Sequence, residues 1–135
     1  VALSTTYIDL CKDNGGHIIF ISSIAGCESL GAPITYTSAK TALLSYAKSL
    51  SNDVAKLNIR VNSISPGNVM FEGSTWDDKI KNNREFVENY ISINVPLNGF
   101  ANPEDIAKAV VYLDDSDFVT GANIVVDGGQ LNKII

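Results

Sequence analysis

Residues 14–23 read Asn14-Gly15-Gly16-His17-Ile18-Ile19-Phe20-Ile21-Ser22-Ser23, an apolar run between residues that favour turns. A continuous apolar run of this length is typical of a strand that is buried on both faces, as in a parallel sheet. The ten residues 3–12 that precede it have the character of the end of a helix, which Asn14-Gly15 would close in a left-handed conformation. This stretch predicts a helix followed by a strand of a parallel sheet.

Helices and strands continue to alternate after this strand, without internal repeats or low-complexity segments. The expected elements are a helix from Thr35 to Leu57, a strand from Ile59 to Ile64, one or two amphipathic helices between Met70 and Phe100, a helix from Asn102 to about Leu113 and a strand from Ala122 to Val126. Ser65-Pro66-Gly67 would break the second strand, where Gly67 could let the backbone approach a ligand. The alternation predicts one α/β domain, with three strands and flanking helices.

The expected helix from Thr35 to Leu57 carries two stripes of residues. Apolar residues with helical period define a core face, formed by Ala39, Leu43, Tyr46, Ala47, Leu50, Val54 and Leu57. A second stripe holds small residues, namely Ser38, Thr41, Ala42, Ser45 and Ser49. This second stripe predicts either a packing interface between subunits or a solvated polar face, and the period favours neither. Asn58 would end the helix in the left-handed region.

Tyr36 and Lys40 are four residues apart on this helix and form a candidate catalytic pair. Positions i and i+4 share one face, so the ammonium can lie close to the phenol. At about 4 Å and an effective dielectric constant near 20, two unit charges interact by roughly 4 kcal/mol, which favours the phenolate. Tyr36 could then donate or accept a proton near neutral pH. Ser23, at the end of the first strand, could polarise a substrate carbonyl through its hydroxyl.

Each of these signals is weak when it is taken alone. Tyr-x-x-x-Lys occurs by chance in amphipathic helices, and a serine pair after a strand is common in loops. The order in which the strand, Ser23, Tyr36 and Lys40 follow one another favours the catalytic interpretation. His17 has no second ligand at metal-binding spacing, so it is expected to be structural or solvated, and no metal site is expected. Trp76 either contacts substrate or closes a small core of its own segment.

Composition excludes several classes of protein. With 135 residues, 45% hydrophobic and 19% charged, the chain is typical of a globular domain. Its net charge of −5 and the lack of a basic cluster argue against a nucleic-acid partner. No apolar run has the roughly 18–20 residues of a membrane span, and the first residues do not form a signal peptide. Cys11 and Cys27 have neither metal-ligand nor disulfide-scaffold spacing. We therefore expect a cytoplasmic protein with no membrane partner.

Five motifs occur in order along the chain, and together they resemble a known family. They are Gly16-His17-Ile18-Ile19-Phe20-Ile21-Ser22-Ser23, Tyr36-Thr37-Ser38-Ala39-Lys40, residues 59–67, residues 102–107 and residues 119–129. The set resembles the C-terminal half of the short-chain dehydrogenase/reductase family, over essentially all 135 residues. The resemblance implies the C-terminal portion of a doubly wound, Rossmann-like parallel sheet. It also implies an NAD(P)-dependent oxidoreductase that transfers hydride between nicotinamide and a carbonyl or alcohol substrate.

The resemblance implies a role for each candidate catalytic residue. Ser23 would orient the substrate carbonyl, and Tyr36 would be the proton donor or acceptor. Lys40 would bind the nicotinamide ribose and favour the ionised form of the tyrosine. Tyr36 and Lys40 would thus both contact the cofactor. The intact protein is expected to be a homo-oligomer, either a dimer or a tetramer.

The residues implied in cofactor binding are incomplete in this sequence. Pro66, Gly67 and Val69 would line the nicotinamide of NAD or NADP. Phe71 stands where family members commonly have a threonine. The family's glycine-rich phosphate loop, which also selects between NAD and NADP, has no counterpart. Residues 1–135 are therefore expected to be a partial NAD(P)-binding domain that lacks the N-terminal dinucleotide-binding strands.

This incompleteness predicts an unpaired edge on the strand at residues 18–21, where a preceding strand would belong. The chain is expected to be part of a longer polypeptide, or to have a separate N-terminal fragment of the same domain as its partner, and to be inactive alone. Two functions stay open, an oxidoreductase and a non-catalytic oligomerisation or binding module. The segment from about residue 70 to 100 would form a lid that shapes the substrate pocket, but its composition does not identify the substrate.

Overall fold

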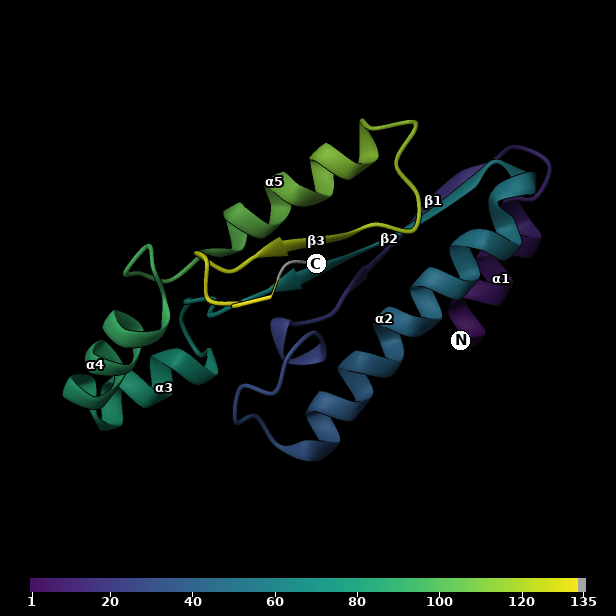
Figure 1. The fold of residues 1–135 in the computed structure, drawn as a ribbon. Helices are drawn as coiled ribbons and strands as arrows, with labels where there is room; N and C mark the ends of the chain where they lie inside the picture. The colour runs from purple at the N-terminus through teal and green to yellow at the C-terminus, as the bar shows by residue number, and fades with distance from the viewer. Residues whose placement is uncertain (134–135) are drawn as a thin grey trace.

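The computed structural model describes residues 1–133 and places three parallel strands in one sheet, in the order β1-β2-β3 (Figure 1). The strands are β1 (Gly16–Ile21), β2 (Ile59–Pro66) and β3 (Asn123–Val126). The predicted α/β fold with parallel strands and flanking helices is therefore confirmed. Pro66 was expected to break the second strand, but it is the last residue of β2. Proline is tolerated there because its missing N–H interrupts no further bond of the ladder.

Helices cover both faces of the sheet. In Figure 1, α1 (Ala2–Cys11) and α2 (Ile34–Val54) lie on one side of the strands and α5 (Pro103–Asp114) lies on the other. Two short 3-10 helices, η1 (Ile24–Gly26) and η2 (Ala55–Leu57), were not expected from the sequence. The two predicted left-handed ends are confirmed, because Gly15 has a φ of 75° and Asn58 a φ of 57°.

The main core lies between β2 and the second half of α2. Ile59 and Val61 pack there against Ala47 and Val54, and all four are buried. The predicted core face is confirmed along this half of the helix. Ala39 was predicted to belong to it and is exposed, because the sheet covers only the second half of α2. The apolar period of the sequence therefore includes residues in the first half of α2 that the sheet does not cover.

β1 is an edge strand in the described part of the chain. It pairs with β2 alone, so the predicted unpaired edge is confirmed. Burial on both faces, which the apolar run predicted, is not found, since no residue of β1 is fully buried and Ile21 is 46% exposed. An apolar pattern shows which side chains favour burial, but the described residues do not cover both faces of β1.

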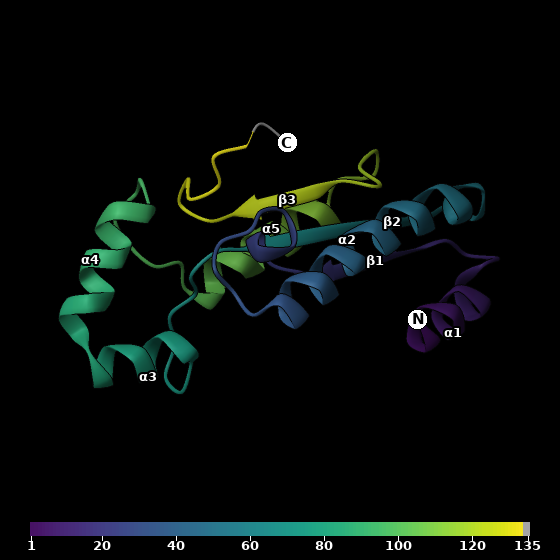
Figure 2. The same ribbon diagram turned by 60° about the horizontal axis from the view of Figure 1, so that its bottom comes forward.

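Residues 70–100 form two amphipathic helices, which we call the lid. They are α3 (Thr75–Asn82) and α4 (Arg84–Asn94), which lie beyond the carboxyl ends of the strands (Figure 2). The lid has a small core of its own, formed by Val87, Ile91 and Val95 with Trp76, Ile80, Tyr90 and Phe100 packed against it. The ring of Trp76 lies 5.3 Å from that of Tyr90 and 5.6 Å from that of Phe100, between centroids. Of the two interpretations of Trp76, the structure therefore favours a place in the core of the lid.

Both ends of α5 are capped. The Asn102 side chain accepts a bond from the backbone N–H of Asp105, and the Asp105 carboxylate accepts one from the N–H of Asn102. At the other end, the Arg60 guanidinium donates to three carbonyl oxygens, those of Leu113, Asp114 and Ser116. The predicted start of this helix is confirmed.

His17 is a structural residue, as one of its two interpretations predicted. Its side chain is only 7% exposed. Nε2 lies 3.0 Å from Nδ2 of Asn62, and Nδ1 lies 3.5 Å from Oδ1 of Asp114. Burial, followed by the positive charge of Arg60, lowers the pKa of His17 from its ordinary value, while Asp114 opposes this shift. Among residues 1–133, no cluster of three or more His, Cys, Asp or Glu side chains could hold a metal ion. No helix within that range is long and apolar enough to cross a membrane.

Candidate active site

The carboxyl ends of the three strands meet at one edge of the sheet because the strands are parallel. Ile21 pairs with Ile64, and Pro66 pairs with Val126. The residues that follow β1, β2 and β3 therefore leave the sheet at this edge, toward which the lid also extends (Figure 2). In open α/β sheets, ligands bind outside the carboxyl ends of the strands.

The two serines after β1 have different roles, since Ser22 is structural and Ser23 is accessible to a ligand. Ser22 is buried, and its Oγ donates to the carbonyl oxygen of Lys40 at 3.1 Å. Ser23 is half-buried and caps η1, since its Oγ accepts a bond from the N–H of Ala25 at 3.2 Å. This bond uses a lone pair and orients the side chain, so the hydroxyl hydrogen of Ser23 can be donated to a ligand.

η1 is held closely against the first half of α2. A Cβ atom on Gly26 would lie 2.8 Å from the carbonyl carbon of Lys40, so only glycine permits this approach. The Thr41 hydroxyl donates to the carbonyl oxygen of Gly26 at 3.0 Å. The bonds from Ser22 and Thr41 and the contact at Gly26 fix the turn that carries Ser23 to the helix that carries Tyr36 and Lys40. This attachment was not predicted from the sequence, where its only signal is a glycine and two hydroxyl residues that are far apart in the chain.

Tyr36 and Lys40 lie next to each other on α2. Lys40 Nζ is 5.7 Å from the centroid of the Tyr36 ring, within the range of a cation–π contact. The same Nζ donates to the carbonyl oxygen of Ile21, the last residue of β1, at 3.1 Å. Tyr36 is 44% exposed and so is accessible to a ligand. The structure thus brings the predicted pair together and joins it to the end of β1.

The segment after β2 is fixed on both sides. The N–H of Gly67 donates to the carbonyl oxygen of Val126 at 2.9 Å, and a Cβ on Gly67 would lie 2.8 Å from Cα of Asp127. The glycine is therefore required by the neighbouring end of β3. Val69 forms a parallel bridge with Ala101, the first residue after the lid. Pro66, Gly67 and Val69 thus lie between β3 and the lid.

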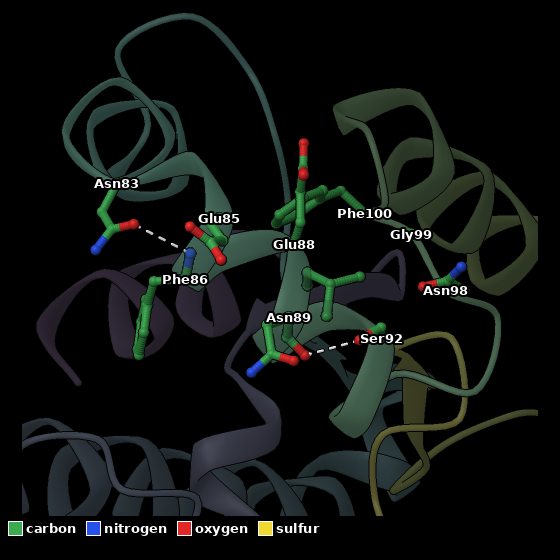
Figure 3. A pocket seen from close by; sticks show the side chains of 10 residues that line it. Asn83, Glu85, Phe86, Glu88, Asn89, Ser92, Asn98, Gly99 and Phe100 are labelled. Carbon is green, nitrogen blue, oxygen red and sulfur yellow. Dashed lines mark hydrogen bonds between the residues drawn. The ribbon is translucent and has the colours of Figure 1, made fainter.

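A pocket of about 860 Å³ lies on the lid itself (Figure 3). Its lining comes from α4 and from Asn98, Gly99 and Phe100, and it includes the carboxylates of Glu85 and Glu88. None of Ser23, Tyr36 or Lys40 lines it. Because the pocket contains none of these three residues, we assign the candidate site to the carboxyl ends of the strands, where the hydroxyl, the phenol and the ammonium are found.

The family model described as enoyl-(acyl carrier protein) reductase matches residues 1–130. Curated relatives include carbonyl reductase family member 4 of Xenopus laevis, which is 33% identical over 120 residues, or 89% of this chain and 47% of the relative. They also include 3-oxoacyl-(acyl-carrier-protein) reductase FabG of Chlamydia trachomatis, 37% identical over 124 residues, or 90% of this chain and 47% of the relative. The chain thus spans about half the length of the curated relatives it matches.

Solved structures agree with this match. L-sorbose reductase from Gluconobacter frateurii, complexed with NADPH and L-sorbose, superposes with a TM-score of 0.85 at 28% identity, over 99% of this chain and 56% of that protein. A 4-hydroxyisoleucine dehydrogenase mutant complexed with NADH and succinate also has a TM-score of 0.85, at 31% identity, over 98% of this chain and 54% of that protein. Sequence, fold and the order of the site motifs agree, and the chain belongs to the short-chain dehydrogenase/reductase family.

Proposed function

We propose that the protein carrying this sequence is an NAD(P)-dependent oxidoreductase that transfers hydride between nicotinamide and a carbonyl or alcohol carbon. The observation that carries the proposal is the position of Lys40, whose ammonium lies beside the Tyr36 ring and binds the last carbonyl of β1. Ser23 leaves the sheet two residues after that carbonyl. Two structural neighbours are complexed with NADPH and NADH, which supports this class of reaction.

In the proposed reduction, the hydride for the carbonyl carbon would come from a nicotinamide held beside Tyr36 and Lys40. Ser23 donates a hydrogen bond to the carbonyl oxygen and so stabilises the negative charge that develops there. Tyr36 donates its phenolic proton to that oxygen, which completes the alcohol. The Lys40 ammonium stabilises the phenolate that is left, because opposite charges attract more strongly at a partly desolvated site. In the reverse direction, Tyr36 accepts the proton of the alcohol.

The residues at this edge fit the nicotinamide and ribose end of the cofactor. Lys40 and Tyr36 offer an ammonium and a phenol to ribose hydroxyls, while Pro66, Gly67 and Val69 would lie beside the ring. The pyrophosphate needs backbone donors at a helix N-terminus after a glycine-rich loop, and residues 1–135 contain no such loop. We therefore propose that residues 1–135 are the catalytic part of the domain and bind NAD or NADP poorly without N-terminal strands, whether these belong to the same polypeptide or to a separate fragment.

We further propose that the intact protein is a homo-oligomer. The stripe of small residues on α2 is exposed along its whole length, at Ser38, Thr41, Ala42, Ser45 and Ser49. Small side chains permit close approach of a second helix, which favours a subunit interface over a solvated face. A cytoplasmic location remains our expectation from composition alone.

A non-catalytic oligomerisation or binding module is the second candidate. The observation that favours it is the exposed stripe of small residues on α2, since such a surface could serve as an interface whether or not the protein binds a cofactor. The two candidates differ in one measurable property, which is binding of a reduced nicotinamide cofactor.

Fluorescence titration of the full-length polypeptide with NADH and NADPH tests the proposal. Binding of either cofactor is expected, with NAD(P)H oxidation in the presence of small ketones, sugars or 3-oxoacyl thioesters. Tyr36→Phe should lower kcat by about 10²- to 10⁴-fold, because the route of the proton is removed, and should weaken cofactor binding far less, since the Lys40 contact with the ribose stays. Tyr112→Phe is the matched control, since Tyr112 is 56% exposed on α5. Failure of both cofactors to bind would favour the non-catalytic module.

A further inference from the structure

A chain of side-chain hydrogen bonds connects the lid to the segment that follows β2. Asn68 Nδ2 donates to Oε1 of Gln130 at 2.8 Å, and Gln130 Nε2 donates to the hydroxyl of Tyr90 at 2.9 Å. Asn68 lies between Gly67 and Val69, Gln130 follows the turn after β3, and Tyr90 belongs to α4. We call this chain of bonds the clasp.

The two amide side chains of the clasp are shielded from water. Asn68 is 9% exposed and Gln130 is 5% exposed. Loss of the Tyr90 hydroxyl would leave an amide donor of Gln130 without this partner, and a buried polar group without a partner costs more than the bond itself contributes. Such networks fix the relative position of the elements they join when every member is satisfied.

Each end of the clasp is attached to a rigid neighbour. The carbonyl oxygen of Asn68 accepts a bond from the N–H of Ala101 at 3.0 Å, and the N–H of Met70 donates back to Ala101 at 2.8 Å. Tyr90 packs against Trp76 in the core of the lid, at 5.3 Å between ring centroids. A movement of α4 is therefore transmitted to the backbone of residues 67–70.

The middle of the clasp rests on the turn after β3. The Asp127 carboxylate accepts bonds from the N–H groups of Gly129 and Leu131, both at 2.8 Å, on either side of Gln130. The N–H of Leu97, at the end of the lid, donates to the carbonyl oxygen of Gly128 at 3.0 Å. The same turn thus fixes Gln130 and the chain that leaves α4.

We propose that Tyr90, Gln130 and Asn68 are positioning residues that couple the lid to the backbone at Pro66–Val69. This inference rests on the proposed function, in which that backbone lines the nicotinamide. Closing the lid over a substrate and ordering the nicotinamide-lining segment are then one event. None of the three residues needs to contact the reacting atoms.

Amide hydrogen exchange of the full-length polypeptide tests the coupling without any cofactor. Tyr90→Phe keeps the ring against Trp76 and removes only the hydroxyl. Exchange should become about fivefold faster, as expected for one lost hydrogen bond, both in α4 and in residues 67–70, which carry no substitution. Tyr112→Phe, on the exposed side of α5, should change neither segment. Faster exchange that is confined to α4 would overturn the coupling.

Steady-state kinetics separate positioning from a general loss of stability. Tyr90→Phe should raise the KM for NADH or NADPH about fivefold and leave kcat within about twofold, the reverse of the pattern expected for Tyr36→Phe. A Tyr90→Phe protein with faster exchange and an unchanged KM would show a structural role only and would overturn the proposal. If the unsubstituted protein binds neither NADH nor NADPH, the proposed function fails, and the exchange comparison still decides whether the clasp couples lid and sheet.

Discussion

Gly26→Ala provides the sharpest test of how the candidate site is assembled. The added Cβ would lie 2.8 Å from the carbonyl carbon of Lys40 and 2.9 Å from its oxygen, and both are backbone atoms of α2. Ordinary van der Waals contact begins near 3.4 Å, so η1 and α2 must separate by about 0.6 Å. This separation moves Ser23 away from the helix that carries Tyr36 and Lys40.

The magnitude of the effect follows from this displacement. A misplacement of about 1 Å can lower an enzymatic rate by about 10²-fold, so we expect kcat to fall by roughly tenfold for the smaller shift. Overpacking of a tight contact costs about 1–3 kcal/mol in the free energy of unfolding. Turnover and denaturant unfolding of the full-length polypeptide measure the two effects separately.

Gly99→Ala is the matched control for this substitution. Its added Cβ would have only one neighbour within 4 Å, the carbonyl oxygen of Leu97 at 3.8 Å, which is an ordinary contact. It should therefore keep both activity and stability. A Gly26→Ala protein with unchanged kcat and unchanged stability would refute the argument that close contact between η1 and α2 assembles the site.

Two further predictions concern the opposite end of the sheet, where β1 and β2 begin. Arg60→Met should lower the free energy of unfolding by roughly 2–4 kcal/mol in a denaturant titration, because three carbonyl oxygens at the end of α5 lose a charged donor, and cofactor affinity should stay unchanged. The pKa of His17 is lower in the folded than in the unfolded chain, so the unfolded chain binds more protons below about pH 6.5 and the free energy of unfolding should decrease as the pH falls from there. His17→Gln should flatten this slope between about pH 6.5 and 5, and an unaltered slope would exclude His17 as its source.

Local signals in the sequence predicted the three strands, the main helices and their order, but not the two 3-10 helices. Asn102-Pro103 predicted the start of α5, Asn58 predicted the end of the helical segment, and the apolar run at residues 18–21 predicted a strand of a parallel sheet. Each of these depends on residues that are neighbours in the chain. Burial cannot be predicted in this way, because it depends on residues that are distant in the chain. Ala39 has the period of a core residue, but no neighbour among residues 1–133 covers it and it is exposed.

In the candidate site, too, contacts between nearby residues were predicted from the sequence and contacts between distant residues were not. The spacing of Tyr36 and Lys40 follows from helical geometry, so the sequence predicted that they are neighbours. The contact of Gly26 with the backbone of Lys40 joins residues that are 14 positions apart, and the clasp joins Asn68 to Gln130 over 62 positions. Nothing in a local pattern distinguishes such a glycine or amide from one in an ordinary turn. These contacts could be found only from the folded chain.

The attachment of η1 to α2 and the clasp bear on different parts of the proposed function. The bonds that attach η1 to α2 and those of the clasp are all formed within residues 1–133. Under the proposed function, affinity for NADH or NADPH would depend on backbone donors for the pyrophosphate at a helix N-terminus after a glycine-rich loop. We therefore expect the full-length polypeptide to bind NADH or NADPH without rearrangement of η1, α2 or the lid.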